Sequence, residues 1–97
     1  MSNAQLEAVL VQIIALLRGT GHEDRADWLD TRLAILGHAQ ATPDSVEHVR
    51  GELHKNVLGM GGLMDLDLRP ADGSPVSKAA LRVELDSLAD RMYAMTR

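Results

Sequence analysis

Residues that could carry out chemistry are few and widely spaced in this sequence. The four histidines are spread along the chain: His22, His38, His48 and His54. Only Asp44, His48 and Glu52 follow one another by one helical turn, a spacing that could present metal ligands. Structural metal sites prefer more histidine or sulfur, and ion pairs on a solvated helix give the same pattern. The chain also has no cysteine and no serine in a G-x-S-x-G turn. We therefore expect no catalytic residue, no bound metal and no enzyme.

A glycine-rich stretch, LGMGGLMDLDLRP at residues 58–70, is the other candidate for a binding site. Glycine-rich loops hold phosphate where a strand passes into a helix, usually with a lysine nearby. Here the stretch follows a predicted helix and lacks the lysine, so we expect a structural corner with no cofactor. The glycines would break the helix while the apolar side chains fill the core. The residues of this motif are Gly59, Met60, Gly61, Gly62 and Leu63.

The alternating leucines and aspartates after the corner predict a short extended arm. Leucines would face inward, and Asp65 and Asp67 would face outward. The two aspartates could begin an EF-hand loop, but Arg69 and Pro70 occupy positions where that loop needs an oxygen ligand and a glycine. Calcium is therefore not expected.

Composition indicates one small globular domain, residues 1–97, because chains of this length usually form a single core. A net charge of −4 and an aromatic content of 2% argue against nucleic acid as a partner, since phosphate contacts need clustered basic residues. No apolar run reaches the roughly 20 residues of a membrane span, and no secretion signal is recognisable. We expect no membrane partner and a cytoplasmic location.

Four segments have helical periodicity, near residues 3–18, 23–40, 43–58 and 76–95. They predict an all-α fold: a single-domain, four-helix bundle-like structure with the glycine-rich corner after the third helix. The predicted core contains Leu10, Ile13, Leu17, Leu29, Leu33, Leu53, Val57, Leu85 and Leu88.

The first predicted helix is apolar on nearly all sides, because Ala4, Ala8, Val11 and Ala15 lie opposite its main stripe. Such a helix is normally buried on more than one side. Two interpretations remain open: it is the central helix of the bundle, or it forms the interface of a homodimer.

The second predicted helix carries Trp28 away from its core stripe, with Asp24, Asp27 and Thr31 nearby. A tryptophan beside acids suits a protein interface, in which the ring supplies affinity and the charges steer a basic partner. Packing of Trp28 against another helix of the same fold is the alternative. We predict that the partner-binding residues are Asp24, Asp27, Trp28, Thr31, Asp65 and Asp67.

The segments DWL and GMGGLMDLDL together resemble a family of small uncharacterised bacterial proteins, over roughly residues 5–68. Members carry a W-x-x-L segment and later a signature of Gly-Met-Gly, a hydroxyl residue, Phe or Leu, Asn-Asp, and Leu or Ile. This chain departs from the signature at Gly62 and Met64, where the hydroxyl residue and the asparagine are expected. Some members resemble toxin-associated immunity proteins. The resemblance implies that the chain is an antitoxin, which neutralises a cognate toxin or effector by occluding its active site. The alternative is a non-enzymatic helical adaptor or dimerisation module.

Overall fold

Helices make up most of the computed structural model, which describes residues 4–38, 40–58, 62–70, 73 and 75–96, without the side chains of Leu58 and Met64. Within these ranges the regular elements are α1 (Ala4–Arg18), α2 (Glu23–Gly37), α3 (Pro43–Leu58), the short 3-10 helix η1 (Leu63–Asp65) and α4 (Lys78–Met95), and no strand is present. The prediction of an all-α fold is confirmed.

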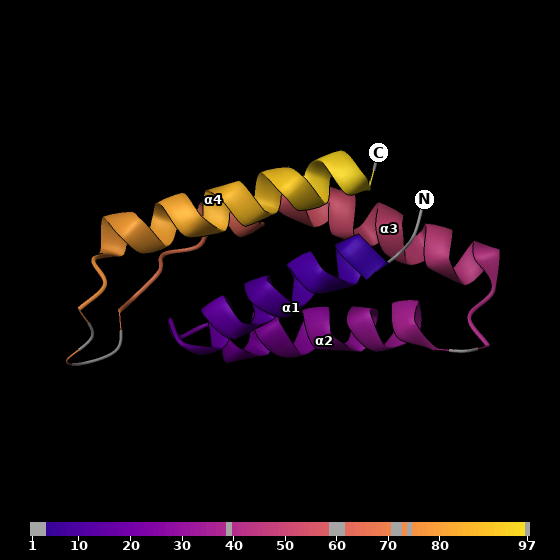
Figure 1. Cartoon of the computed structure of the whole chain (residues 1–97), viewed down its shortest axis with the longest axis horizontal. Coiled ribbons are helices and arrows are strands. Elements are labelled where there is room, and N and C mark those ends of the chain that lie inside the picture. The colour runs from indigo at the N-terminus through magenta and orange to yellow at the C-terminus, as the bar shows by residue number, and fades with distance from the viewer. Residues whose placement is uncertain (1–3, 39, 59–61, 71–72, 74, 97) are drawn as a thin grey trace.

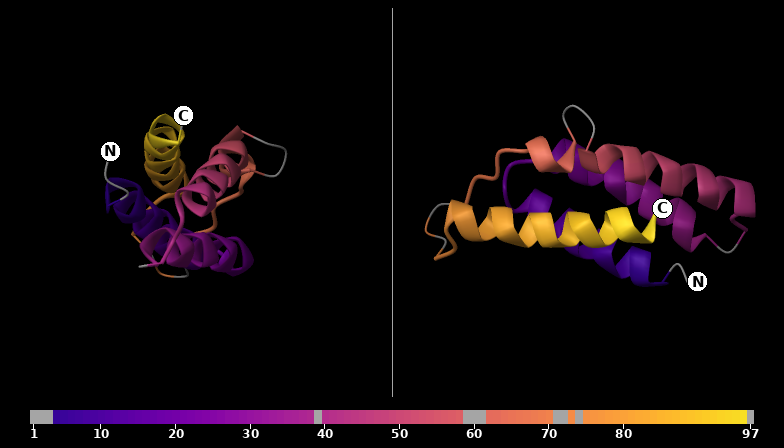
Figure 2. Two further views of the ribbon diagram at one scale, coloured as in Figure 1. Left: turned by 90° about the vertical axis from the view of Figure 1, so that its right-hand side faces the viewer. Right: turned by 90° about the horizontal axis from the view of Figure 1, so that it is seen from above.

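The four α-helices of the described ranges lie antiparallel, each beside the helix that follows it in the sequence (Figure 1). α1 packs against α2 and α4, and α3 packs against α2 and α4. The end-on view in Figure 2 therefore shows the helices arranged around a common centre. The short links at residues 19–22 and 38–42 favour antiparallel packing of α1 with α2 and of α2 with α3, whereas the link to α4 is longer, at residues 59–77, and includes η1. The predicted four-helix bundle-like fold is confirmed.

Hydroxyl side chains mark the beginnings of two helices. Before α3, the Oγ1 of Thr42 accepts the N–H of Ser45 at 3.1 Å. Before α4, the Oγ of Ser77 accepts the N–H of Ala80 at 3.1 Å. Each bond satisfies a backbone donor that the first turn leaves without a helical acceptor. Because Ser77 is the cap, α4 begins at Lys78 and not at residue 76 as predicted.

The two ends of the second helix depend on backbone geometry. Gly21 has a φ of +86°, which lets the chain turn sharply between α1 and α2. α2 ends at Gly37 and not at residue 40 as predicted, because His38 adopts an extended conformation with φ −73° and ψ 130°. An ideal Cβ added to Gly37 would lie 2.8 Å from Oε1 of Glu7. That oxygen ends a flexible side chain, which can move aside.

The hydrophobic core lies where the inner faces of all the α-helices meet. Eight of the nine predicted core residues are buried in it: Leu10, Ile13, Leu17, Leu29, Leu53, Val57, Leu85 and Leu88. The ninth, Leu33, is partly buried and packs against the core instead of inside it. Burial of such side chains contributes most of the favourable free energy of folding.

α1 buries one face and leaves the opposite face open. Leu10, Ile13 and Leu17 are fully buried, whereas Val11 is 54% exposed, and Ala8 is exposed as well. The interpretation of α1 as an enclosed central helix is therefore wrong, since α1 occupies the same peripheral position as its neighbours. A homodimer through α1 stays a prediction.

Among the described residues, no helix is both long and apolar enough to cross a membrane.

The glycine-rich corner is described from Gly62 onward; Gly59, Met60 and Gly61 lie outside the described residues. Gly62 is buried in an extended conformation, and Leu63 after it is fully buried. The chain then makes the η1 turn before it extends. Residues 63–69, called the arm below, therefore begin with a 3-10 turn that the sequence did not predict.

The arm is tied to the end of the bundle by backbone carbonyls as well as leucines. The guanidinium of Arg82 on α4 donates to the carbonyl oxygens of Leu63 at 3.1 Å and Leu66 at 2.8 Å. Leu68 is buried and Leu66 is partly buried, so the leucines face inward as predicted. Arg82 supplies a donor to the carbonyl of Leu66 and a second donor to that of Leu63, which also accepts the N–H of Leu66 at 3.5 Å.

Candidate protein-interaction surface

Helical spacing gathers the predicted residues of α2 on the outer side of that helix. Asp24, Trp28 and Thr31 recur at i, i+4 and i+7, and Asp27 lies next to them. Asp24, Asp27 and Thr31 are exposed, and Trp28 is half-buried. We call these four residues the α2 surface.

Trp28 contributes to both the fold and this surface. Its side chain packs against the core, and the guanidinium of Arg32 lies 4.4 Å from the centre of its ring. Arg32 in turn donates through Nη2 to Oε2 of Glu52 on α3 at 2.9 Å. It also donates through Nη1 to Oγ1 of Thr31 at 2.8 Å. The ring thus makes a cation–π contact with a guanidinium that is itself paired with α3.

The charge of Asp27 is compensated within the protein. Nη1 of Arg18 at the end of α1 donates to Oδ1 of Asp27 at 2.7 Å, and its Nη2 lies 3.7 Å from Oδ2 of Asp30. The hydrogen bond from Arg18 to Asp27 raises the pKa of this arginine above its ordinary value, and the nearby carboxylates add to the effect. Asp27 is therefore less available for a partner than the sequence indicated.

The two aspartates of the arm face outward, as predicted, and both are exposed. Asp67 forms an ion pair with Nζ of Lys78 at the start of α4, and its Oδ2 lies 3.7 Å from Nε of Arg69. The hydrogen bond from Lys78 lowers the pKa of the Asp67 carboxyl below its ordinary value. Asp67 thus holds the arm against α4 in addition to presenting charge at the surface.

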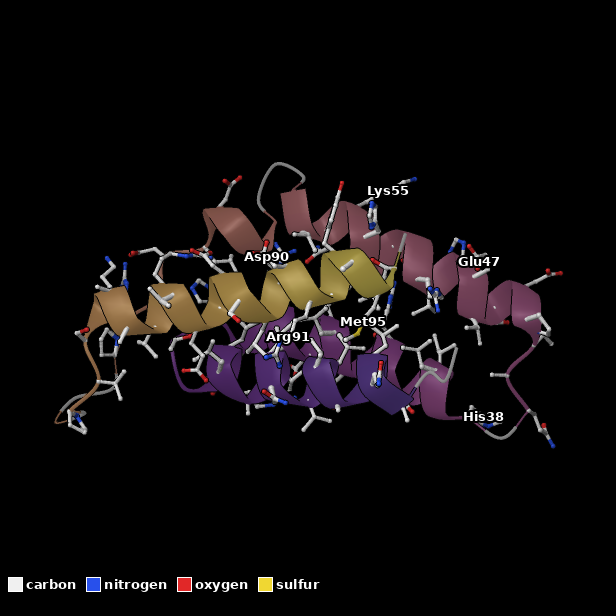
Figure 3. The ribbon with its side chains drawn as sticks, turned by 45° about the horizontal axis from the view of Figure 1, so that its top comes forward. His38, Glu47, Lys55, Asp90, Arg91 and Met95 are labelled. Atoms are coloured by element: carbon white, nitrogen blue, oxygen red, sulfur yellow. The ribbon has the colours of Figure 1, made fainter. Side chains whose placement is uncertain are left out.

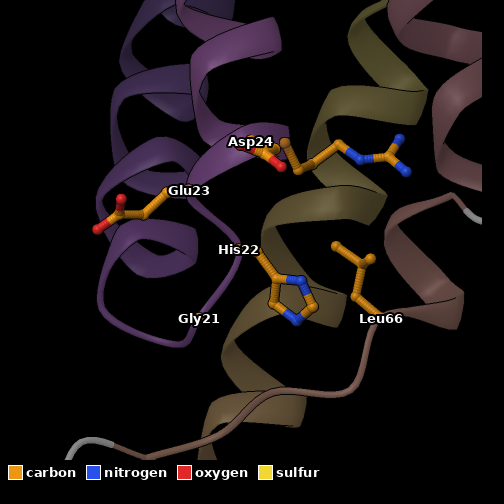
Figure 4. A pocket seen from close by; sticks show the side chains of 6 residues that line it. Gly21, His22, Glu23, Asp24 and Leu66 are labelled. Carbon is orange, nitrogen blue, oxygen red and sulfur yellow. The ribbon is translucent and has the colours of Figure 1, made fainter.

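His22 brings the arm next to the beginning of α2. Its Nε2 lies 2.6 Å from the backbone oxygen of Asp67, to which it donates. Figure 4 shows its imidazole beside the side chain of Leu66, while Glu23 points to the opposite side. These residues line an open hollow of about 480 Å³ that Asp24 also borders. The structure therefore joins the arm to the Asp24 end of the α2 surface, while Trp28 and Thr31 are connected to α3.

The spacing of Asp44, His48 and Glu52 brings two of these side chains together on α3. Nε2 of His48 lies 3.4 Å from Oε1 of Glu52, whose second oxygen accepts from Arg32. Within the part of the chain that the structure describes, no group of three or more His, Cys, Asp or Glu side chains is placed to hold a metal ion. Both carboxylate oxygens of Glu52 already have protein partners, His48 and Arg32.

Three residues that build this surface were missed from the sequence. Arg32 follows Trp28 by four residues, and this spacing alone indicates that the two side chains can meet. Glu52 and His22 gave no such signal, because each acts on an element distant in sequence: Glu52 on α2, and His22 on the arm.

The comparisons with known proteins add no relative to this picture. No protein-family model, no curated protein and no solved structure matches the chain.

Proposed function

We propose that this protein is a non-enzymatic inhibitor, an immunity protein that binds a cognate bacterial toxin or secreted effector and occludes its active site. One observation above all supports the proposal. Trp28 is partly open to solvent on the outer side of α2, and its ring is stacked on the guanidinium of Arg32, which is itself paired with Glu52.

A fixed aromatic ring is well suited to tight binding. Tryptophan and arginine dominate the binding energy of many protein interfaces, and here the two are stacked on each other. A side chain that is already ordered loses little conformational entropy on association, whereas ordering a mobile one costs about 0.5–1.5 kcal/mol. The α2 surface can therefore anchor a partner through Trp28 at low entropic cost.

The exposed charges near Trp28 favour a basic partner, whereas the two arginines one turn away on either side, Arg25 and Arg32, are partly buried. Asp24 is exposed one turn before the tryptophan, and Asp27 and Asp30 lie further round the same helix. The whole chain carries a net charge of −4. Carboxylates at the rim of an interface mainly accelerate association and select partners of opposite charge. Because Arg18 neutralises part of the charge at Asp27 and Asp30, Asp24 has the larger role in this steering.

Co-expression with the product of each neighbouring gene tests the function. We expect one such product to be toxic alone, and to be bound and silenced in the presence of this chain. Asp24→Arg should weaken binding, as should Trp28→Ala in a variant that circular dichroism shows to be folded. Glu84→Arg is the matched control, since Glu84 is an exposed acid on α4, away from the α2 surface. If no neighbour is toxic, or if a toxic neighbour is neither bound nor silenced, the immunity function is wrong. If both α2 variants bind normally, only the surface is wrong.

A homodimeric regulatory module is the second candidate, and the outer face of α1 is the observation in its favour. Val11 is 54% exposed there, and Ala8 and Ala15 on the same side are also exposed. Light scattering decides this alternative: a dimer that Val11→Asp converts to a monomer would support it. A monomer at every concentration tested would exclude it.

A further inference from the structure

A groove runs along the seam between α2 and α3, beside the side chains of Trp28, Arg32 and Glu52, called the Trp28 cluster below. It consists of two hollows of about 530 and 350 Å³ that share Ile35 and Ser45. His48, Val49 and Glu52 line one end, and His38 and Ala41 line the other. Figure 3 shows His38 toward the end of the molecule where α2 finishes and α3 starts. Because Arg32 bridges Trp28 to Glu52, the groove continues from the α2 surface.

Ile35 gives the groove an apolar centre. It is 38% exposed, and on α2 and α3 it is the one large aliphatic side chain so exposed among the described residues. Ala34, Ala41 and Val49 add apolar surface around it. A single exposed isoleucine is ordinary, but this one lies where two open, shallow hollows meet, so an apolar side chain of a partner could contact it.

The charged groups around Ile35 are acidic. Asp44 and Glu52 line the groove, and neither lysine nor arginine is among the described residues that line it. Glu52 is paired with Arg32, so Asp44 contributes most of the negative charge of the groove. Nδ1 of His38 accepts the N–H of Gln40 at 3.0 Å. The last turn of α2 contains no basic residue to offset the negative end of its helix dipole.

We infer that this groove binds a basic amphipathic helix of the partner protein, with an apolar side chain against Ile35 and a cation near Asp44. The inference rests on the proposed function and specifies the chemistry of the partner. Grooves between helices commonly accept the apolar face of such a helix. On α3 the lining residues run from Asp44 to Glu52, about 12 Å at 1.5 Å per residue, which corresponds to about eight residues of a bound helix.

A second copy of this chain is a poorer occupant. Each copy carries a net charge of −4, so self-association through an acidic groove would bring like charges together in a low-dielectric interface. Like-charge contacts at interfaces are strongly unfavourable. A partner of opposite charge gains the attraction that a second copy loses.

Synthetic peptides test the inference without the toxin. The first probe is a blocked peptide of about 14 residues, made of leucine and lysine with leucines on one helical face. The second has the same composition in scrambled order, and the third replaces lysine by glutamate. Trp28 is the only tryptophan and lies next to the groove, so its fluorescence reports binding, and NMR shift changes locate the site. We expect the first peptide to bind about ten-fold or more tightly than either of the others.

Paired variants distinguish binding in the groove from general electrostatic attraction of the peptide to the protein. Ile35→Ala should weaken binding of the first peptide about five- to ten-fold. Val83→Ala should not change its affinity, although Val83 on α4 is 69% exposed. Asp44→Asn should weaken it more than Glu47→Gln, because Glu47 is on the same helix but does not line the groove.

Three outcomes would each overturn the inference. They are equal binding of all three peptides, NMR shift changes outside the groove, and equal effects of the two variants in a pair. A homodimer in solution that Ile35→Glu dissociates would overturn it too, since the groove would then hold a second copy. These outcomes leave the immunity function untouched, because they involve no toxin. Conversely, failure of the co-expression test with a positive peptide result would disprove the function and retain the groove.

Discussion

Replacing Arg32 tests whether the Trp28 cluster is as firmly built as the structure indicates. Arg32 makes a cation–π contact with Trp28 and a 2.9 Å hydrogen-bonded ion pair with Glu52 on α3. The cation–π contact contributes about 0.5–2 kcal/mol, and a hydrogen bond to a charged group about 1.5–3 kcal/mol. The side chains of Arg32 and Glu52 remain 23% and 27% exposed, so water screens part of both interactions. We therefore expect Arg32→Ala to lower the free energy of unfolding by about 2 kcal/mol.

A double-mutant cycle isolates the part that belongs to the ion pair. Arg32→Ala, Glu52→Ala and the double variant are unfolded in urea and followed through circular dichroism and Trp28 fluorescence. We expect a coupling free energy of about 1 kcal/mol between the two side chains. The Arg18–Asp27 pair is the control: it is shorter, at 2.7 Å, but its side chains are 41% and 65% exposed. Such exposed pairs usually contribute little, so no measurable coupling is expected there.

This comparison tests whether burial or distance determines the coupling free energy of an ion pair in this protein. If the Arg18–Asp27 pair couples as strongly as the Arg32–Glu52 pair, the argument from partial burial is wrong. A coupling of zero for Arg32 and Glu52 would mean that Trp28 is not held by α3, and would remove the main support for a pre-oriented anchor. Arg32→Lys gives an independent check, because lysine keeps the charge but loses the planar group that stacks on the ring.

Three further predictions concern the core, one turn and the arm. Leu53→Ala should lower the free energy of unfolding by about 2–5 kcal/mol in urea titration, because Leu53 is fully buried and leaves a cavity; a loss below about 1 kcal/mol would contradict its place in the core. Gly21→Ala should cost about 1 kcal/mol in the same assay because of its positive φ; an unchanged midpoint would argue against that turn. The pKa of Asp67 is lowered in the folded protein, so its contribution to stability is present above pH 3.8 and lost as the pH falls through the lowered value. Lys78→Met should raise that pKa toward 3.8 in an NMR titration, and no change would contradict the ion pair.

The sequence alone determined the features that depend on local periodicity and on single residues. Stripes such as Leu10, Ile13 and Leu17 predicted both a helix and its buried face, because side chains three and four residues apart share one side of a helix. The inward leucines of the arm followed from alternation in the same way. The exposed acids of the α2 surface were also predictable, since Trp28 and its neighbours lie off the core stripe.

Only the tertiary structure decided which of these surfaces meet. Arg32 on α2 pairs with Glu52 on α3. His22 donates to the backbone oxygen of Asp67, and Arg82 donates to carbonyl oxygens of the arm. No spacing rule predicts these contacts, because their partners are separated by 16 to 45 positions in the sequence. The groove around Ile35 has the same origin: its walls belong to two helices whose relative placement is fixed by packing, while periodicity describes each helix by itself.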